Sequence, residues 1–213
     1  LSLRLAMIAP RLKAATIGWQ HNCYDGYLHV KPVVFWQQEN LLQQYLPNLD
    51  RYIVLSDYDK RDYMEKLGID CEVKINPRSF VSEKKCDVKS KRFLMATRFV
   101  YAKGLDLMME SFEEFCKEDS EWELDIIGDG DLFDQIRADA KKRHLEKRVH
   151  FVGYTNEPEK YYLNSSVFLL PSRWEGWPMV IMEAFEFGLP VIAYHMGAMD
   201  LIIDDGKTGF LPE

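Results

Sequence analysis

From residue 92 onward, short apolar stretches alternate with longer segments in which apolar positions recur every three to four residues. The short stretches, such as 124–127 and 167–170, have the length and continuous apolar character of buried strands. The longer segments have the period of helices with one face in a core. This alternation predicts an α/β domain with a doubly wound parallel sheet covered on both faces. The predicted strands are 92–96, 122–127, 149–152, 167–170, 191–193 and 209–211, and the predicted helices are 105–116, 132–144, 158–163 and 179–187.

The first third of the chain shows the same alternation but begins inside a helix, predicted at 1–15. Ser56 has the residue type and place of an N-cap for a helix through Leu67. Because a doubly wound domain normally opens with a strand, we expect the chain to lack the start of this domain. The other predicted elements are a strand at 15–19, a loop at 21–31, a helix at 35–45, and strands at 51–55 and 71–75.

A segment between these two regions has neither period. Residues 77–90 contain Pro77, several serines and a charged run at 83–85. This composition is typical of a connection between domains. We therefore expect residues 1–81 to be the remnant of an N-terminal domain, 82–91 to be a linker, and 92–213 to be a C-terminal domain.

The composition excludes several classes of protein. A net charge of −7 disfavours nucleic acid as a partner, because a phosphate backbone needs a clustered positive face. No apolar run reaches the ~20 residues that cross a bilayer, so we expect a cytoplasmic protein. The four cysteines, which have no Cys-x-x-Cys pair, are interpreted as reduced thiols; they are Cys23, Cys71, Cys86 and Cys116.

Residues 1–15 carry Arg4, Arg11 and Lys13 among apolar residues. Such a segment suits either a packed helix or a basic surface helix on anionic lipid. The packed helix is favoured because the segment is short and Pro10 interrupts its period. Peripheral contact with the inner membrane surface stays open as the alternative.

The densest chemical signal follows the fourth predicted strand of the C-terminal domain. A polar loop, 171–177, leads to Pro178, which suits the first position of a helix. Open parallel sheets bind ligands at the carboxyl ends of their strands. There, free N–H groups of Met179, Val180 and Ile181 would favour a phosphate.

Two carboxylates flank the start of this helix, Glu175 before it and Glu183 in its second turn. A carboxylate can accept a hydrogen bond from each hydroxyl of a vicinal diol, which suits ribose or hexose. The alternative is an exposed loop acid and a solvated helix position. Because Glu183 stands among apolar residues, where an unpaired charge is costly, the sugar-binding role is favoured.

Arg98 and Lys103 lie just after the first predicted strand of this domain. Cations at that edge of the sheet could neutralise a diphosphate leaving group without a metal. As an alternative, both are ordinary surface charges. Their position after a strand end favours the first interpretation.

Residues 128–131, Gly-Asp-Gly-Asp, carry two weak signals. The Asp-x-Asp spacing could hold a divalent metal, and the Gly-x-Gly could begin a dinucleotide loop, but the third glycine of that fingerprint is absent. A tight turn with Asp131 as helix N-cap is simpler, so no metal site is predicted. His21, after the strand at 15–19, could bond a sugar or phosphate, or be a packed or loop histidine.

The Glu175–x7–Glu183 spacing resembles the E-x7-E motif of the retaining GT-B glycosyltransferases of family 4, the glycosyl transferases group 1. The similarity covers about residues 92–213 in family order, and the first third resembles the later strands of the family's acceptor-side domain. The segments that carry it are 97–98, 103–104, 127–130, 151–153, 170–172, 188–193 and 205–210, with 73–77 similar to the pre-linker segment.

The resemblance implies a GT-B fold with two Rossmann-like domains, a nucleotide-diphosphate sugar donor, and no metal or other cofactor. By position, Glu183 would bind ribose hydroxyls, Glu175 hexose hydroxyls, and Arg98 with Lys103 the diphosphate. The expected catalytic residues are Glu175, Arg98, Lys103 and His21, and the expected nucleotide contacts are Glu183, Arg98, Lys103, Met179, Val180, Ile181, Gly128 and Tyr154.

This sequence departs from the family pattern at Thr97 and Pro178, where glycines are common, and at Asp200, where glutamate is common. None of these changes removes a charge that the chemistry needs. The family's glycine-rich N-terminal donor loop and its C-terminal crossover helix have no counterpart here. We therefore expect this chain alone to be inactive.

The function that the resemblance implies is transfer of a hexose to a glycan or lipid-linked acceptor with retention of configuration, in cell-surface polysaccharide synthesis. Two alternatives stay open: a nucleotide-sugar-binding module without turnover, and a GT-B-type epimerase that needs no acceptor. The motifs do not specify the donor base, the hexose, the acceptor or the linkage.

Overall fold

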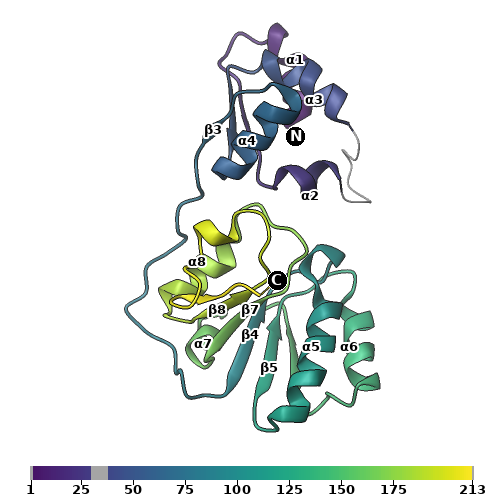
Figure 1. Cartoon of the computed structure of the whole chain (residues 1–213), viewed down its shortest axis with the longest axis vertical. Helices are drawn as coiled ribbons and strands as arrows, with labels where there is room; N and C mark the ends of the chain where they lie inside the picture. The colour runs from purple at the N-terminus through teal and green to yellow at the C-terminus, as the bar shows by residue number, and fades with distance from the viewer. Residues whose placement is uncertain (1, 30–37, 213) are drawn as a thin grey trace. The chain divides into compact units, whose positions relative to one another are not determined.

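The computed structural model describes residues 2–29 and 38–212. It divides into two compact units, the first Leu1–Pro77 with Trp174–Trp177 and the second Arg78–Arg173 with Pro178–Glu213. Each unit has its own parallel sheet and its own core (Figure 1). The chain therefore forms two α/β bodies.

The first unit is built on a three-stranded parallel sheet in the order β1-β2-β3. The predicted alternation of strands and helices is confirmed, although each strand is shorter than predicted. The elements are α1 (Ser2–Ile8), η1 (Ala9–Arg11), β1 (Ile17–Trp19), α2 (Tyr24–Leu28), α3 (Glu39–Tyr45), η2 (Leu46–Asn48), β2 (Arg51–Val54), α4 (Asp57–Leu67) and β3 (Glu72–Val73).

The loop predicted at 21–31 is wrong, because it contains α2. The Gly26 amide donates a hydrogen bond to Cys23 Sγ (3.3 Å), which caps the helix, and Tyr24 and Leu28 are buried. This cap and this apolar pair outweigh the low helix propensity of glycine. Residues 30–37, which include the start of the helix predicted at 35–45, lie outside the described part of the chain; α3 is the rest of that helix.

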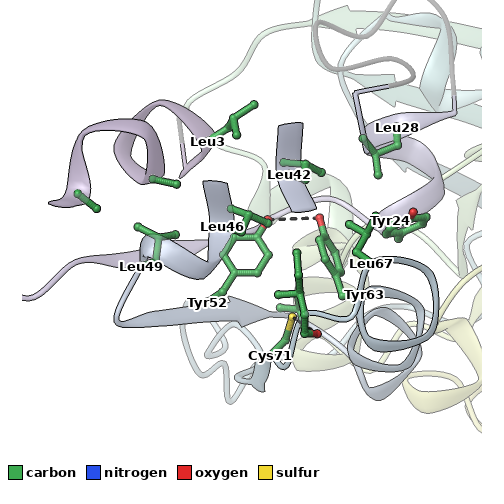
Figure 2. Close-up of a cluster of buried hydrophobic side chains, with 14 residues drawn as sticks. Leu3, Tyr24, Leu28, Leu42, Leu46, Leu49, Tyr52, Tyr63, Leu67 and Cys71 are labelled. Carbon is green, nitrogen blue, oxygen red and sulfur yellow. Dashed lines mark hydrogen bonds between the residues drawn. The ribbon is translucent and has the colours of Figure 1, made fainter. Parts of the chain in front are cut away.

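The core of the first unit joins helices from both ends of its sequence (Figure 2). Leu3 of α1, Leu42 of α3 and Leu67 of α4 are buried in one cluster. The buried hydroxyls of Tyr52 and Tyr63 lie 3.3 Å apart and share a hydrogen bond. Because Leu3 belongs to this core, the start of the chain is a packed helix as predicted, but α1 ends at Ile8 and not at residue 15. Lipid contact by its exposed face is not tested by this packing.

The second unit is a six-stranded parallel sheet in the order β6-β5-β4-β7-β8-β9. β5 and β6 lie on one side of β4, and β7, β8 and β9 lie on the other, which is the strand order of a Rossmann fold. The predicted doubly wound α/β fold is confirmed. The elements are β4 (Arg92–Ala96), η3 (Tyr101–Lys103), α5 (Leu105–Glu118), β5 (Glu123–Ile127), α6 (Phe133–Lys142), β6 (Val149–Gly153), α7 (Glu159–Leu163), β7 (Val167–Leu170), α8 (Met179–Glu186), β8 (Val191–Ala193), η4 (Met199–Leu201) and β9 (Gly209–Phe210).

The sheet of the second unit has a core on each face, because successive strand residues point to opposite sides. Phe93 and Met95 of β4 pack in the cluster that holds residues of α5 and α6. Leu94 and Ala96 pack in the cluster that holds residues of α7 and α8. Helices therefore cover both faces, as the alternation predicts (Figure 1).

Residues 74–91 connect the two sheets and contain no helix or strand. The later part of this segment is attached to the second unit. The Cys86 amide, for example, donates a hydrogen bond to the Phe187 carbonyl (2.8 Å). The assignment of 82–91 as the linker stays a prediction.

Candidate functional site

Strands β4 and β7 are neighbours in the middle of the second sheet, although β5 and β6 come between them in the chain. The chain leaves β4 toward α5 and leaves β7 toward α8, and these helices pack on opposite faces. At such a switch point the connections diverge at the carboxyl ends of the strands, where open α/β sheets bind ligands. Arg98 and Lys103 follow β4, and the loop 171–178 follows β7, so both predicted groups begin at this edge.

The turn after β4 lies tightly against the loop after β7. Gly104 has φ +62°, and a Cβ atom there would lie 1.9 Å from the Pro171 carbonyl oxygen. Only glycine fits this approach. Lys103 is half-buried and has contacts of its own, whereas Arg98 is exposed and pairs with no carboxylate in the described part of the chain. Arg98 is therefore the more accessible of the two predicted cations.

Arg173 joins these two connections, and the sequence reasoning missed it. Its guanidinium donates hydrogen bonds to both oxygens of Asp106 (2.8 and 2.6 Å) and lies 4.0 Å from the centre of the Tyr101 ring. The Arg173 amide also donates to the Ala102 carbonyl (2.8 Å). The hydrogen bonds from Arg173 lower the pKa of Asp106, so this carboxylate stays charged. A partner 67 residues away gives no local signal in sequence.

Glu175 lies in the loop that precedes α8, in the segment 174–177 that groups with the first unit. The alternative of an exposed loop acid stays open. The role predicted for it in binding a hexose stays a prediction.

The start of α8 differs from the prediction in two ways. Pro178 is the N-cap residue, one position before the helix. The Ile181 amide donates to the Pro178 carbonyl (3.1 Å), so the predicted free N–H of Ile181 is wrong. The amides of Met179 and Val180 stand in the first turn, which has no intrahelical acceptors for them. They are the donors in α8 that suit a phosphate.

Glu183 is half-buried on α8, so the alternative of a solvated helix position is wrong. The Tyr162 hydroxyl of α7 donates a hydrogen bond to Glu183 Oε2 (2.9 Å). Burial raises the pKa of Glu183, and this hydrogen bond partly opposes the rise. The carboxylate is thus costly to ionise, and among residues 2–29 and 38–212 one buried donor stabilises it.

Glu183 lines a pocket of about 760 Å³ between α7, α8 and residues 80–84. Its volume falls in the range of small-molecule sites, about 300–1,000 Å³. The wall formed by Tyr162, Leu163 and Phe187 is largely buried, while charged residues line the rim. The charged residues are Lys84, Glu157, Glu159 and Lys160.

The Gly-Asp-Gly-Asp turn after β5 is explained by close packing. A Cβ atom at Gly128 would lie 1.8 Å from the Thr97 carbonyl oxygen, and one at Gly130 would lie 2.8 Å from the Phe99 amide nitrogen. Both glycines therefore let the turn after β4 pass beside them. The N-cap of α6 is Leu132, without a side-chain cap, so the assignment of Asp131 as N-cap is wrong.

Two further predicted site residues are Tyr154 and His21. Tyr154, directly after β6, is 78% exposed. His21 belongs to the first unit, where it is exposed and stacks on Trp19 with ring centres 5.2 Å apart. Their predicted roles stay predictions.

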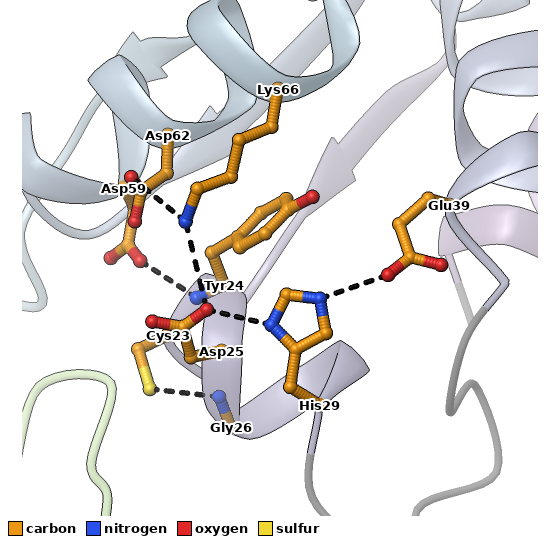
Figure 3. A network of polar contacts seen from close by, with 9 residues as sticks. All are labelled: Cys23, Tyr24, Asp25, Gly26, His29, Glu39, Asp59, Asp62 and Lys66. Atoms are coloured by element: carbon orange, nitrogen blue, oxygen red, sulfur yellow. Dashed lines mark hydrogen bonds and ion pairs between the residues drawn. The ribbon is translucent and has the colours of Figure 1, made fainter.

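A polar network in the first unit was not anticipated from the sequence (Figure 3). The His29 ring lies between Asp25 Oδ1 (2.8 Å from Nδ1) and Glu39 Oε1 (2.9 Å from Nε2), which joins α2 to α3. The Tyr24 amide donates to Asp59 (2.9 Å), and burial raises the pKa of this carboxyl. These contacts hold α2 between α3 and α4.

The predicted cap of α4 and the predicted thiols are both found. Ser56 Oγ accepts a hydrogen bond from the Asp59 amide (3.1 Å). All four cysteines are free. Burial raises the pKa of Cys23 to about 11 and that of Cys71 to about 12, so both thiols are protonated at neutral pH.

Across residues 2–29 and 38–212, no helix combines the length and apolar character needed to cross a membrane. Within the same residues, no three His, Cys, Asp or Glu side chains cluster as a metal site would require.

Comparison with known proteins gives relatives of both the sequence and the fold. The family profile "Glycosyl transferases group 1" matches residues 79–213. An uncharacterized glycosyltransferase of Haemophilus influenzae is 29% identical over 167 residues, which are 77% of this chain and 47% of that protein. The amylovoran biosynthesis glycosyltransferase AmsD of Erwinia amylovora is 34% identical over 120 residues, 55% of this chain and 34% of that protein. The chain spans about half the length of these relatives, or less.

A solved structure of similar fold is that of an S. aureus TarM mutant in complex with fondaparinux, alpha-GlcNAc-glycerol and UDP. Its TM-score is 0.82 at 24% identity, over 94% of this chain and 41% of that chain. At this identity the likeness concerns the fold alone. The GT-B fold predicted from the sequence is confirmed.

Proposed function

Because the chain belongs to the glycosyl transferases group 1 family, we propose that it is the nucleotide-sugar-binding domain, with part of the acceptor-side domain, of a retaining glycosyltransferase of family 4. The whole protein moves a hexose from a nucleotide-diphosphate sugar to a glycan or lipid-linked acceptor in cell-surface polysaccharide synthesis. It works in the cytoplasm. The name of the Erwinia relative, which refers to amylovoran biosynthesis, supports the polysaccharide role.

One observation carries the proposal: the groups suited to each part of such a donor begin at a single edge of the second sheet. Arg98 and Lys103 follow β4, and the loop with Glu175 follows β7, its neighbour. Glu183 is on the helix that this loop enters, and it lines a pocket. The UDP in the similar TarM structure supports a nucleotide at this kind of site.

In this mechanism different side chains of the chain bind different parts of the donor. Arg98 and Lys103 neutralise the negative charge that grows on the diphosphate as the bond to the hexose breaks. Glu183 accepts hydrogen bonds from the ribose, and Glu175 accepts them from the hexose. With two cations at the diphosphate, the reaction proceeds without a metal.

The test uses the full-length protein and a panel of UDP-, GDP- and ADP-sugars, first by thermal shift and then by turnover. A transferase consumes donor only with acceptor present, and NMR of the product gives the anomeric configuration. Sugar inversion at a ring carbon without acceptor would instead identify an epimerase. Binding without either reaction would identify a binding module. Activity that survives EDTA supports the metal-free step, and its loss would overturn that step.

We also propose peripheral contact with the inner membrane face. Met7 and Ile8 are about half exposed on the first unit, close in sequence to the exposed cations Arg4 and Arg11. An apolar and basic surface of this kind binds anionic lipid. Co-sedimentation with vesicles containing phosphatidylglycerol, but not with pure phosphatidylcholine, is the expected result; no sedimentation with either would refute the contact.

A further inference from the structure

Tyr162 is the only hydrogen-bond partner of the Glu183 side chain in the described part of the chain. It is 1% exposed, and its ring stacks between Phe168 (centres 5.8 Å apart) and Phe187 (5.2 Å). These aromatic contacts fix the ring, so the hydroxyl has one position from which to donate. From that position the hydroxyl donates to Glu183 Oε2, 2.9 Å away.

The hydroxyl of Tyr162 acts as a permanent donor. Burial raises its pKa far above the ordinary value, and the adjacent Glu183 charge raises it further. At neutral pH the proton therefore stays on the tyrosine oxygen. The hydrogen bond thus holds Glu183 Oε2 in place, which leaves Oε1 as the oxygen that can be presented to a ligand with both lone pairs in the pocket that both residues line.

We propose that Tyr162 is a positioning residue for nucleotide binding: it holds one oxygen of Glu183 so that the other meets the ribose hydroxyls of a nucleoside diphosphate. This inference rests on the proposed function, because it takes the ribose as the partner of Glu183. It goes further because it assigns recognition of the ribose to two helices: Tyr162 of α7 positions Glu183 of α8. Tyr162 itself touches Glu183 and not the reacting atoms.

The pH dependence of binding follows from this arrangement. Burial raises the pKa of Glu183 and the Tyr162 hydrogen bond lowers it. The carboxylate accepts both ribose hydroxyls only when ionised, so affinity falls as the pH drops through this pKa. Without the Tyr162 hydroxyl the pKa is higher and the fall begins at a higher pH. The other charged groups around the pocket, Lys84 paired with Glu159 (2.7 Å) and Lys160 paired with Glu157 (3.2 Å), are unchanged by the substitution.

The experiment is calorimetric titration of the full-length protein with UDP, GDP and ADP. The titration is then repeated at several pH values with the nucleotide that binds most tightly. The variants are Tyr162→Phe, Glu183→Gln and the double variant. Tyr162→Phe keeps the stacked ring, and thermal unfolding checks that the variant is folded. Tyr161→Phe is the matched control, since it removes a hydroxyl one residue away on the same helix.

We expect Tyr162→Phe to weaken the nucleotide about tenfold at neutral pH, as loss of one hydrogen bond to a charged group implies. Its affinity should begin to fall at a higher pH than in the wild type, and Tyr161→Phe should behave as the wild type does. In the Glu183→Gln background, the Tyr162→Phe change should have little further effect, because the two residues act through one contact.

Equal losses from Tyr162→Phe in both backgrounds, or an unshifted pH profile, would overturn the positioning role while leaving the transferase proposal intact. A wild-type protein that binds none of the three nucleotides would overturn the proposed function, and this inference with it.

Discussion

Two regions of the second unit hold their charged groups in different ways. At the carboxyl ends of β4 and β7, the two connections are joined by the ion pair of Arg173 and Asp106, whose side chains are 19% and 54% exposed. In the α7–α8 pocket, the Glu183 carboxylate is held by the buried, uncharged hydroxyl of Tyr162. Exposed ion pairs contribute little to stability and weaken with salt. A buried hydrogen bond to a charge is stronger and is costly to leave unmade. On the proposed function, the edge at β4 and β7 should therefore respond to charge and ionic strength, and the α7–α8 pocket to shape and protonation.

The largest expected effect comes from the cations. Arg98→Ala or Lys103→Ala in the full-length protein should raise the reaction barrier by about 2–4 kcal/mol, because charge develops on the diphosphate as the bond breaks. Turnover should fall far more than affinity for an uncharged acceptor. Steady-state kinetics on both variants measure this, with Lys142→Ala, an exposed cation on α6, as control. Unchanged turnover in both variants would refute their assignment.

The close approach of the two connections gives the next effect. Gly104→Ala should lower the free energy of unfolding by about 2–4 kcal/mol, because it adds both left-handed strain and a clash with the Pro171 carbonyl. Gly206→Ala is the matched control. It has φ +78° but no atom within 4 Å, so it should cost only about 1 kcal/mol. Urea unfolding compares them, and equal losses would argue against the close approach.

Substitution of the two motif glutamates, Glu175 and Glu183, should weaken the binding of different ligands. Glu183→Gln should weaken free nucleotide by about 10- to 100-fold, because Tyr162 can occupy the single amide oxygen and leave an N–H₂ group facing the ribose. Glu175→Gln should leave free nucleotide nearly unaffected and weaken only the nucleotide sugar. Calorimetry with both ligands decides. If Glu175→Gln weakens plain nucleotide as much, the division of roles is wrong.

The smallest effect is expected at Arg173. Arg173→Ala should reduce turnover about tenfold by loosening the loop that carries Glu175, and Arg173→Lys should fall in between, since lysine cannot bond both oxygens of Asp106 in a fork. High salt should narrow the gap between wild type and Arg173→Ala. Kinetics at two ionic strengths test this, with Lys207→Ala, which breaks an exposed pair with Asp204, as control. Wild-type turnover in Arg173→Ala would show that the ion pair positions nothing.

The sequence predicted the second sheet well because its strands are continuous apolar runs. The bounds of β4, β7 and β8 match the prediction, and each is buried from both faces. The edge at which the motif residues meet also follows from sequence, since parallel strands share their carboxyl ends. The first unit was harder: α2 is short, contains a glycine and depends on a cysteine cap, none of which is typical of a helix.

Contacts between distant segments could not be predicted in the same way. Tyr162 reads as an ordinary apolar position of α7, and its partner is 21 residues away. The bond from the Ile181 amide to the Pro178 carbonyl depends on the backbone angles at Pro178, which a single sequence does not specify. In both cases the sequence identified the element but not the partner of a polar group.

The strand order also determines how the second unit could be divided. Strands β4, β5 and β6 are consecutive in the chain and lie on one side, and β7, β8 and β9 are consecutive and lie on the other. A cut in the connection before α7 would leave the cations after β4 on one piece and both motif glutamates on the other. A ligand that contacts both groups would then favour reassembly of the two pieces, since it binds only the joined form. If the unit binds a nucleotide sugar as proposed, association of the two pieces would then measure that binding.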